Sequence, residues 1–327
     1  MKEFRITTND SGQRLNKFLE KAVPRLPGGL MHKYIRLKRI KVNGKRTEAA
    51  YRLVENDRVQ LYLNDDFFTL PSEAAAYTAI RQPQLSILYE DEQILLADKA
   101  PGMVVHADES GDTDTLIAHI QAYLFQSGQW NPDDALSFTP ALCNRIDRNT
   151  GGIVIAAKTA EALRLLNEGI RAHALHKRYL CIVHGQPQPA EGRISLFLRR
   201  DEKRKLVTAH QTQVPGAKTA VTIYRTLSAR NGLSLLRCEL ITGRTHQIRA
   251  HLAAIGHPLL GDCKYGTAAQ NQPYGERVQA LYSYELSFDG LPEGCILESL
   301  NGRTFTVKNI PFVNKYFPNG GCLRSQA

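Results

Sequence analysis

Hydrophobic positions near the start of the chain follow the period of a helix. Within residues 14–22 the apolar side chains fall three and four positions apart, which predicts a helix. Asp10 or Ser11 is placed to cap its beginning, and Pro24 ends it. Two glycines at positions 28–29 then open a second predicted helix.

The period changes to that of a strand immediately after these helices. Residues 40–42 and 59–63 alternate between apolar and polar side chains, and Asn43 followed by Gly44 is a strong signal for a tight hairpin turn. Two short helices and a small hairpin therefore make a compact unit of about sixty residues.

Residues 64–84 carry little periodicity and are predicted to be a linker. From residues 85–89 and 94–97 onward, strands, loops and helices mix irregularly, without repeated β-α-β units. The predicted fold class is α+β. A small αα-β-hairpin domain, residues 1–63, precedes a larger domain, residues 85–327, with a mixed, mostly antiparallel sheet flanked by helices.

A short loop before a wholly apolar run holds the first candidate for chemistry. Residues 153–157 predict a buried strand, and Asp147 lies just before it between Arg145 and Arg148. The two glycines at 151–152 let another backbone approach closely. A carboxylate kept charged at the end of a sheet is a candidate nucleophile or base. The alternative is a structural ion pair between Asp147 and a neighbouring arginine.

Two other segments place polar side chains on regular elements. Tyr179 alternates with Cys181 and Val183, so all three share one face of a predicted strand, where a tyrosine serves either the core or a site. Farther along, Thr242 or Thr245 is placed to cap a helix that Gly256 and Pro258 close. The apolar stripe of this helix is formed by Ile248, Leu252 and Ile255. Arg249 lies at the edge of that stripe.

Composition narrows the class of protein. The chain has 327 residues with 43% hydrophobic content, which predicts about two domains, and no run approaches the ~20 apolar residues of a membrane span. Six scattered cysteines without a CxxC pair predict free thiols in a reducing cytosol. His246 and His251 are five positions apart, not the four of a helical zinc pair, so no metal site is expected.

Positive charge is concentrated at one end of the chain. Residues 1–63 hold fifteen Lys and Arg against six Asp and Glu, whereas the remainder holds 27 against 26. A basic module attached to a near-neutral body favours a polyanionic partner. Nucleic acid is the simplest such partner, and an acidic membrane surface is the weaker option.

The basic module resembles an S4 RNA-binding domain. The resemblance rests on residues 14–19 (RLNKFL), 40–45 (IKVNGK) and 55–59 (ENDRV). In that family the second helix and the following turn present basic side chains to structured RNA. By this resemblance the expected phosphate contacts are Lys33, Arg36, Lys38, Arg39 and Lys45. A solvated helix face is the plainer reading, and the local excess of positive charge favours RNA.

The larger domain is similar to RluA-type RNA pseudouridine synthases over most of residues 85–310. Four segments carry the similarity in the same order: residues 98–106, 145–150 (RIDRNT), 176–185, and 243–249 (GRTHQIR) with Gly-His-Pro and Gly-Asp after it. The chain departs from the usual pattern at three positions, which are Ala100, Asn144 and Gly151.

The resemblance implies roles for five residues. Asp147 would be the essential carboxylate, acting on a uridine flipped out of the RNA, and Arg249 would keep it charged. Tyr179 would pack its ring on the uracil and serve in the proton step at C5. Arg145 would support the loop or reach the nucleotide, and Ile248 would form an apolar wall. The reaction is an isomerisation, so no cofactor and no metal are implied.

The expected partner is RNA, most simply 23S ribosomal RNA, with transfer RNA left open. The protein is expected to be a cytoplasmic monomer. One rival is a non-catalytic RNA-binding or ribosome-assembly protein that keeps the same fold. A second is a glycosidase or nuclease, but such glycosidases need two carboxylates at a defined separation, and no second acid stands near Asp147 in the sequence.

Overall fold

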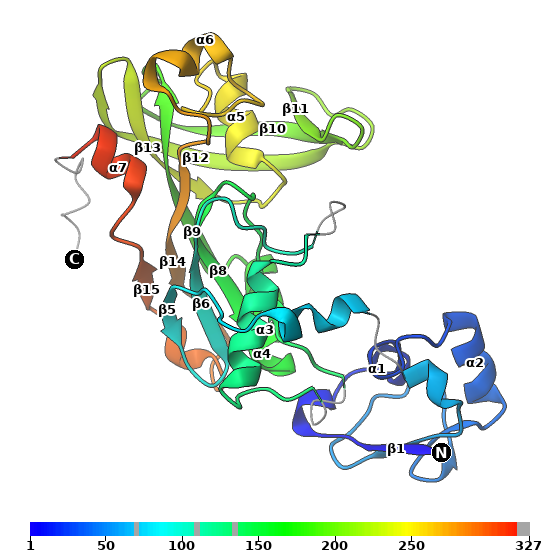
Figure 1. Ribbon diagram of the computed structural model, residues 1–327. Coiled ribbons are helices and arrows are strands. Elements are labelled where there is room, and N and C mark those ends of the chain that lie inside the picture. Colours follow the sequence, from blue (N-terminus) through cyan, green and yellow to red (C-terminus); the bar gives the residue numbers. More distant parts are fainter. Residues whose placement is uncertain (69–71, 108–111, 133–136, 319–327) are drawn as a thin grey trace.

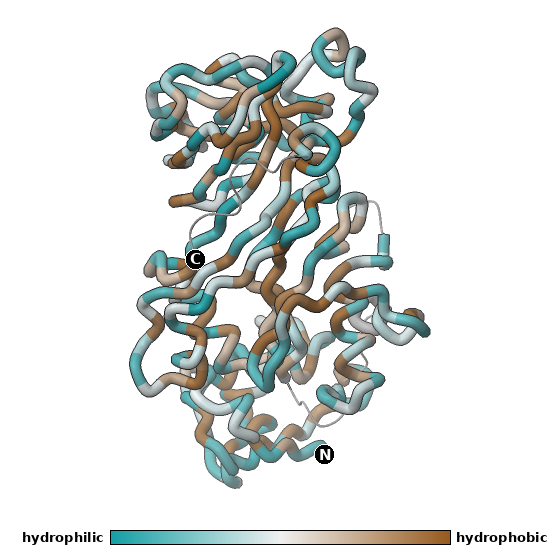
Figure 2. The backbone as a smooth tube through the Cα atoms, turned by 90° about the vertical axis from the view of Figure 1, so that its left-hand side faces the viewer, coloured by the Kyte–Doolittle hydropathy of each residue, from teal (hydrophilic) through white to brown (hydrophobic). Residues whose placement is uncertain are grey.

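The computed structural model describes residues 1–68, 72–107, 112–132 and 137–318. Its strands form two sheets, a small one near the N-terminus and a large one that runs through the rest of the molecule (Figure 1). Figure 2 shows hydrophobic segments passing through the interior of the molecule, while hydrophilic chain lies mostly at its margin.

The small sheet has the strand order β1-β4-β2-β3 and packs against two helices. Its strands are β1 (Lys2–Arg5), β2 (Ile40–Val42), β3 (Lys45–Arg46) and β4 (Arg58–Leu61). The helices are α1 (Leu15–Ala22), α2 (Gly28–Arg36) and the short 3-10 helix η1 (Thr8–Asp10). Apolar side chains from both helices and three strands form a closed core of their own.

Sequence patterns predicted this unit well except at two points. Asn43 and Gly44 both have positive φ, 51° and 75°, as a tight hairpin turn between β2 and β3 requires. Strand β1 was not predicted. The capping prediction was wrong, because the N-cap of α1 is Arg14 and no side chain caps it. Asp10 instead belongs to η1 and is fully buried.

Buried Asp10 belongs to a polar contact between the N-terminal unit and the larger body. Its carboxylate accepts a hydrogen bond from Ser137, whose hydroxyl also accepts one from Gln13 at 2.8 Å. The side chain of Asn9 accepts the backbone N–H of Ala160, in the first turn of α4 (Ala160–Arg171), at 3.3 Å. These contacts fasten η1 to the helix layer of the larger domain.

The segment expected to be a linker has regular structure within its described residues, 64–68 and 72–84. It contains the 3-10 helices η2 (Asp65–Phe68) and η3 (Ser72–Ala79). Tyr77 of η3 is buried edge-on against Phe125 and Trp130 of the larger domain. An aromatic side chain that finds such partners orders a segment whose own sequence has no period.

The large sheet has eleven strands, and most pairs are antiparallel as predicted. Nine follow the order β11-β10-β12-β13-β9-β14-β8-β6-β5, with β15 on β14 and β7 on β8. The strands are β5 (Ile87–Glu90), β6 (Ile94–Lys99), β7 (Ala141–Leu142), β8 (Gly151–Ala157), β9 (Leu175–His184), β10 (Glu191–Asp201), β11 (Leu206–His210), β12 (Lys218–Arg230), β13 (Leu233–Leu240), β14 (Leu281–Phe288) and β15 (Thr304–Thr306). Among the described pairs, β8 with β14 is parallel.

Helices flank this sheet, which confirms a mixed α+β fold. Besides α4 they are α3 (Leu116–Gln126), α5 (Gln247–Ala254), α6 (Ala268–Asn271), α7 (Pro311–Tyr316), η4 (Gln272–Tyr274) and η5 (Glu298–Leu300). Figure 1 places α5 and α6 at the opposite end of the molecule from the N-terminal unit. Within the described ranges, no helix is long and apolar enough to cross a membrane.

The glycine pair at the start of β8 permits β8 and β14 to approach each other closely where they pair. A Cβ on Gly152, whose φ is 115°, would lie 2.2 Å from the carbonyl oxygen of Ser283. A Cβ on Gly151 would lie 2.3 Å from the ring of Tyr282, which explains why no larger residue stands there. This contact anchors the loop that carries Asp147.

Candidate active site

Asp147 lies in the loop between β7 and β8, and its side chain is 25% exposed. The loop is fixed by its backbone, because the carbonyl of Arg148 accepts hydrogen bonds from the N–H of Gly102 and from Lys99 Nζ, both at 2.9 Å. Upstream, the side-chain Oδ1 of Asn144 accepts a hydrogen bond from the backbone N–H of Ile155 at 2.8 Å. The carboxylate is thus held on a rigid loop and remains open to solvent.

Arg249 on α5 pairs with Asp147 across the site, as the resemblance implied. Its Nη1 donates to Asp147 Oδ2 at 2.7 Å. The same guanidinium makes a two-pronged contact with Asp262, from Nε at 2.7 Å and from Nη2 at 2.9 Å. The structure thus pairs Asp147 with an arginine 102 positions along the chain.

Opposite charges keep the buried pair of Arg249 and Asp262 ionised. Burial alone would raise the pKa of Asp262, but the hydrogen bonds and charge of Arg249 hold it below its ordinary value. Burial alone would lower the pKa of Arg249, but Asp262 and Asp147 outweigh it and raise the pKa above its ordinary value. Asp262 has no exposed surface, so one acid is committed to orienting Arg249 while the other faces the solvent.

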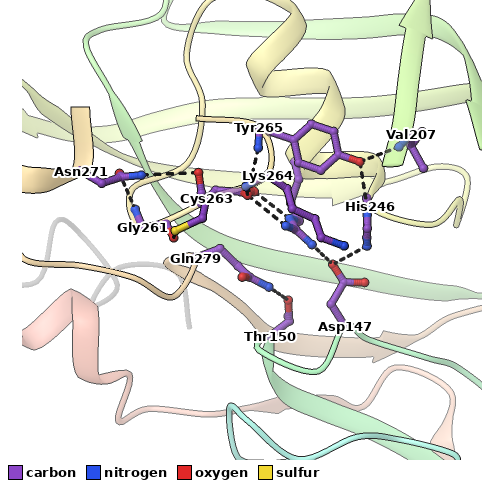
Figure 3. Close-up of polar contacts among 12 residues, drawn as sticks. Asp147, Thr150, Val207, His246, Gly261, Cys263, Lys264, Tyr265, Asn271 and Gln279 are labelled. Atoms are coloured by element: carbon purple, nitrogen blue, oxygen red, sulfur yellow. Dashed lines mark hydrogen bonds and ion pairs between the residues drawn. The ribbon is translucent and has the colours of Figure 1, made fainter. Parts of the chain in front are cut away.

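His246 and Tyr265 complete the cluster around Asp147 (Figure 3). His246 Nε2 lies 3.8 Å from Asp147 Oδ2, and its Nδ1 lies 2.9 Å from the phenol oxygen of Tyr265. His246 is also the N-cap of α5, in the left-handed conformation with φ 52°. The predicted caps were wrong, since Thr242 donates instead to the side chain of Gln247 at 2.8 Å.

Tyr179 projects from β9 into the apolar cluster beside the site. It shares that cluster with Cys181 and Val183, as predicted, and with Ile248 of α5. Burial raises the pKa of Tyr179 to about 12, opposed by a hydrogen bond with Ser283 and reinforced by the charge of Asp147. The phenol is therefore protonated at neutral pH.

The remaining predicted residues of the larger domain differ in exposure. Ile248 is 4% exposed, and Arg249, placed at the edge of the stripe, is 6% exposed. Ile255 was wrongly assigned to the buried stripe, because it is 37% exposed. Arg145 is exposed, and its side chain makes no hydrogen bond or ion pair with any residue that the structure describes.

Sequence reasoning missed three members of the site. Asp262 stood in the Gly-Asp pair of the family pattern without an assigned role, and His246 was considered only as a metal ligand. Tyr265 belonged to none of the motifs considered. All three residues lie within twenty positions of Arg249 and on either side of its helix, and this proximity in sequence is the signal that they share. Within the described part of the chain, no three His, Cys, Asp or Glu side chains are grouped to hold a metal.

Lys99, the last residue of β6, supports the Asp147 loop from inside. It is 1% exposed, and its ammonium donates to the carbonyls of Ala100, Met103 and Arg148 at 2.8–2.9 Å. Burial lowers its pKa to about 8, although Asp147 and Asp98 oppose that shift. A buried cation thus joins the turn after β6 to the loop before β8.

The low pKa of Lys99 predicts a pH-dependent stability. Between pH 8 and about 10.4 the folded lysine has lost a proton that the unfolded chain still binds, so the free energy of unfolding rises with pH. The full contribution is about 3 kcal/mol, from a shift of roughly 2.5 pKa units. We expect urea unfolding from pH 7.5 to 10.5 to show wild type gaining stability over Lys99→Met. If the free energies of unfolding of wild type and Lys99→Met change with pH in parallel, the lowered pKa of Lys99 is contradicted. The control is Lys17→Met, at an exposed lysine.

The five predicted phosphate contacts all lie on the surface of the N-terminal unit. Lys33 and Arg36 project from the second half of α2, Lys38 and Arg39 follow its end, and Lys45 begins β3. All five are exposed. Figure 1 shows α2 far from α5, the helix that carries Arg249, so these basic residues form a surface separate from the site.

Known proteins share this sequence and fold. Residues 93–254 match the RNA pseudouridylate synthase family. An uncharacterised RNA pseudouridine synthase of Mycoplasma genitalium is 32% identical, over 95% of this chain and 97% of its own length. Ribosomal large subunit pseudouridine synthase D of Zymomonas mobilis is 31% identical, over 86% of this chain and 88% of its own.

A solved structure agrees with the fold. The human RNA pseudouridylate synthase domain containing 4 protein superposes with a TM-score of 0.55 at 21% identity, over 73% of this chain and 93% of its own. The fold and the sequence together define an RNA-modifying isomerase. The chain belongs to the RNA pseudouridine synthase family, in its RluA branch.

Proposed function

We propose that Asp147 is the essential carboxylate that isomerises a uridine flipped out of RNA. The observation that carries this proposal is the unequal use of its two oxygens. Arg249 holds Oδ2, whereas Oδ1 makes no hydrogen bond to any residue that the structure describes. A carboxylate with one oxygen anchored and the other open to solvent is prepared to react with a ligand.

The chemistry requires no external atoms. The bond between N1 of uracil and C1′ of ribose breaks, the uracil turns, and C5 bonds to C1′ while its proton moves to N1 by way of the site. Asp147 either attacks C1′ or removes a ribose proton to give a glycal. Both routes need a carboxylate close to the sugar, and Arg249 holds that carboxylate by a charge-assisted hydrogen bond of 2.7 Å.

The remaining side chains would line the space in which the detached uracil rotates. In this proposal the ring of Tyr179 packs on the base, and its phenol oxygen serves in the transfer of the C5 proton. Ile248, in the same apolar cluster, forms a wall. Exposed Arg145, two residues before Asp147, reaches the flipped nucleotide or the strand it left. Extrusion of the uridine costs a few kcal/mol, which phosphate contacts offset.

We further propose that large-subunit ribosomal RNA is the substrate. We also propose that residues 1–63 form an S4-like RNA-binding domain, which residues 64–84 join to the catalytic domain, residues 85–327. Two relatives support the substrate by name: synthase D of Zymomonas mobilis, and ribosomal large subunit pseudouridine synthase C of Haemophilus ducreyi, which is 32% identical over 81% of this chain. The separate core and exposed basic face of residues 1–63 support the RNA-binding role.

Mapping of pseudouridine in total RNA tests the substrate. Cells with and without this gene are compared by chemical labelling of pseudouridine and reverse transcription. We expect one or a few positions of large-subunit ribosomal RNA to lose the modification without the gene and to regain it on complementation. Loss confined to transfer RNA would refute the ribosomal assignment, and no loss anywhere would refute a role in these cells.

The basic face should control RNA affinity through phosphate contacts. We expect the triple change Lys33→Gln, Arg36→Gln, Lys38→Gln to weaken binding and to reduce the slope of log affinity against log salt by about 2, because each lost contact lowers it by about 0.7–0.9. Filter binding over a salt series measures both. The matched control removes three exposed cations of the larger body, namely Arg171, Arg230 and Lys308. Equal effects of the two triple variants would contradict a specific role for α2.

A further inference from the structure

The phenol of Tyr265 has two polar neighbours and one proton to donate. Its oxygen accepts the backbone N–H of Val207, on β11, at 2.9 Å. Its other contact is His246 Nδ1 at 2.9 Å. Burial raises the pKa of Tyr265 to about 12, so the phenol keeps its proton at neutral pH. Because Val207 can only donate, the arrangement that uses the phenol proton has Tyr265 donating to His246 Nδ1.

This contact selects one tautomer of the imidazole. A neutral histidine whose Nδ1 accepts a hydrogen bond carries its own proton on Nε2. Nε2 is the atom that faces Asp147 Oδ2, at 3.8 Å. A movement on the order of 1 Å turns this contact into a hydrogen bond of ordinary length. Figure 3 shows Tyr265, His246 and Asp147 in this order.

The surroundings of His246 favour its neutral form. Burial lowers its pKa, and the charges of Arg249 and Lys264 lower it further, against the opposite effects of Asp147 and Asp262. Its side chain is 13% exposed. A neutral donor can hold the carboxylate without adding a second full positive charge next to Arg249, which would weaken the carboxylate as a nucleophile or base.

We propose that His246 is a positioning residue for Asp147, with its donor tautomer set by Tyr265. His246 Nε2–H and Arg249 Nη1 act on the same oxygen, Oδ2, and so fix the rotation of the carboxylate that points Oδ1 at the ribose. This inference rests on the proposed role of Asp147 and adds a neutral donor to it. His246 also begins α5 in the left-handed backbone conformation, which is uncommon for a residue other than glycine.

Two substitutions at position 246 separate the side chain from the backbone. Asparagine adopts the left-handed conformation readily but is too short to reach Asp147. Glutamine carries an amide N–H at about the distance of Nε2. We expect His246→Asn to lower the single-turnover rate of tritium release from [5-³H]uridine-labelled large-subunit ribosomal RNA by about 10–100-fold, with RNA affinity changed less than threefold. We expect His246→Gln to recover a rate within about fivefold of wild type.

Tyr265→Phe tests the tautomer. The ring that lies 5.1 Å from the guanidinium of Arg249 is kept, and only the hydroxyl is lost. We expect a rate about 5–20-fold below wild type and, by ¹⁵N NMR of labelled histidine, a shift of His246 from the Nε2–H tautomer towards a mixture. Tyr123→Phe is the control. Tyr123 lies on α3 and its phenol donates a hydrogen bond to Glu90 at 2.9 Å, so its loss should change neither the rate nor the tautomer of His246.

The outcomes distinguish this inference from the function on which it rests. A wild-type rate in His246→Asn, alongside an inactive Asp147→Asn, overturns the role of His246 and leaves that of Asp147 intact. An Nδ1–H tautomer in the wild-type protein also overturns it. Substantial turnover by Asp147→Asn would instead remove the proposed function itself.

Discussion

Replacing Asp147 by asparagine is expected to abolish turnover while RNA binding persists. Asparagine has the same shape, but its amide can neither form the sugar adduct nor accept a ribose proton. We expect the single-turnover rate to fall by at least roughly 10⁴-fold, as for the removal of other essential catalytic groups. Tritium release from labelled ribosomal RNA gives the rate. Filter binding should give an affinity within about threefold of wild type, because phosphate contacts dominate affinity.

A neighbouring acid provides the matched control for this experiment. Asp112 lies 3.7 Å from Arg148 and is more exposed than Asp147, with 36% of its side chain accessible. Asp112→Asn makes the same chemical change beside the same loop and is expected to retain activity. Product formed by Asp147→Asn at more than about one hundredth of the wild-type rate would contradict the essential role of its carboxylate.

Replacing Arg249 by methionine is expected to damage both stability and catalysis. Arg249 is 6% exposed, and its guanidinium neutralises Asp262, which has no exposed surface at all. Removing one partner of a buried pair leaves an uncompensated charge, and we expect the free energy of unfolding to fall by about 3–5 kcal/mol. Urea denaturation measures the loss. Turnover should fall as well, because Asp147 Oδ2 loses its 2.7 Å hydrogen bond.

A double substitution separates these two effects. Changing Asp262 to leucine along with Arg249→Met removes both charges of the buried pair and should restore a large part of the stability. It should not restore activity, because Asp147 still lacks its cation. Recovery of turnover in the double variant would show that Arg249 acts only through folding, which is contrary to the role proposed here.

Local patterns predicted individual elements well where a short stretch of chain decides the conformation. The alternation around Asn43-Gly44 predicted the hairpin, and the apolar run before Lys158 predicted the buried strand β8. Both helix caps were assigned wrongly. Capping depends on backbone geometry at a single residue, and His246 begins α5 in a conformation that residue preferences disfavour.

Residues without a period were ordered by distant partners. The segment expected to be a plain linker holds Tyr77, which is buried against Phe125 and Trp130 about fifty positions away in sequence. Asp10 was expected to cap a helix and instead bonds to Ser137, 127 positions along the chain. Such contacts gain their energy from burial and pairing in the folded state, so local sequence patterns do not predict them.

By itself the sequence determined the α+β class, the basic N-terminal module, the family resemblance and the candidate residues Asp147, Tyr179 and Arg249. Periodicity, charge and motif order are local properties of a chain and can be read before it folds. Only the tertiary structure decided that one guanidinium pairs with two acids and that Tyr265 and His246 lie beside Asp147. Those choices depend on ångström-scale distances between residues up to 102 positions apart, which only the packed sheet and helices establish.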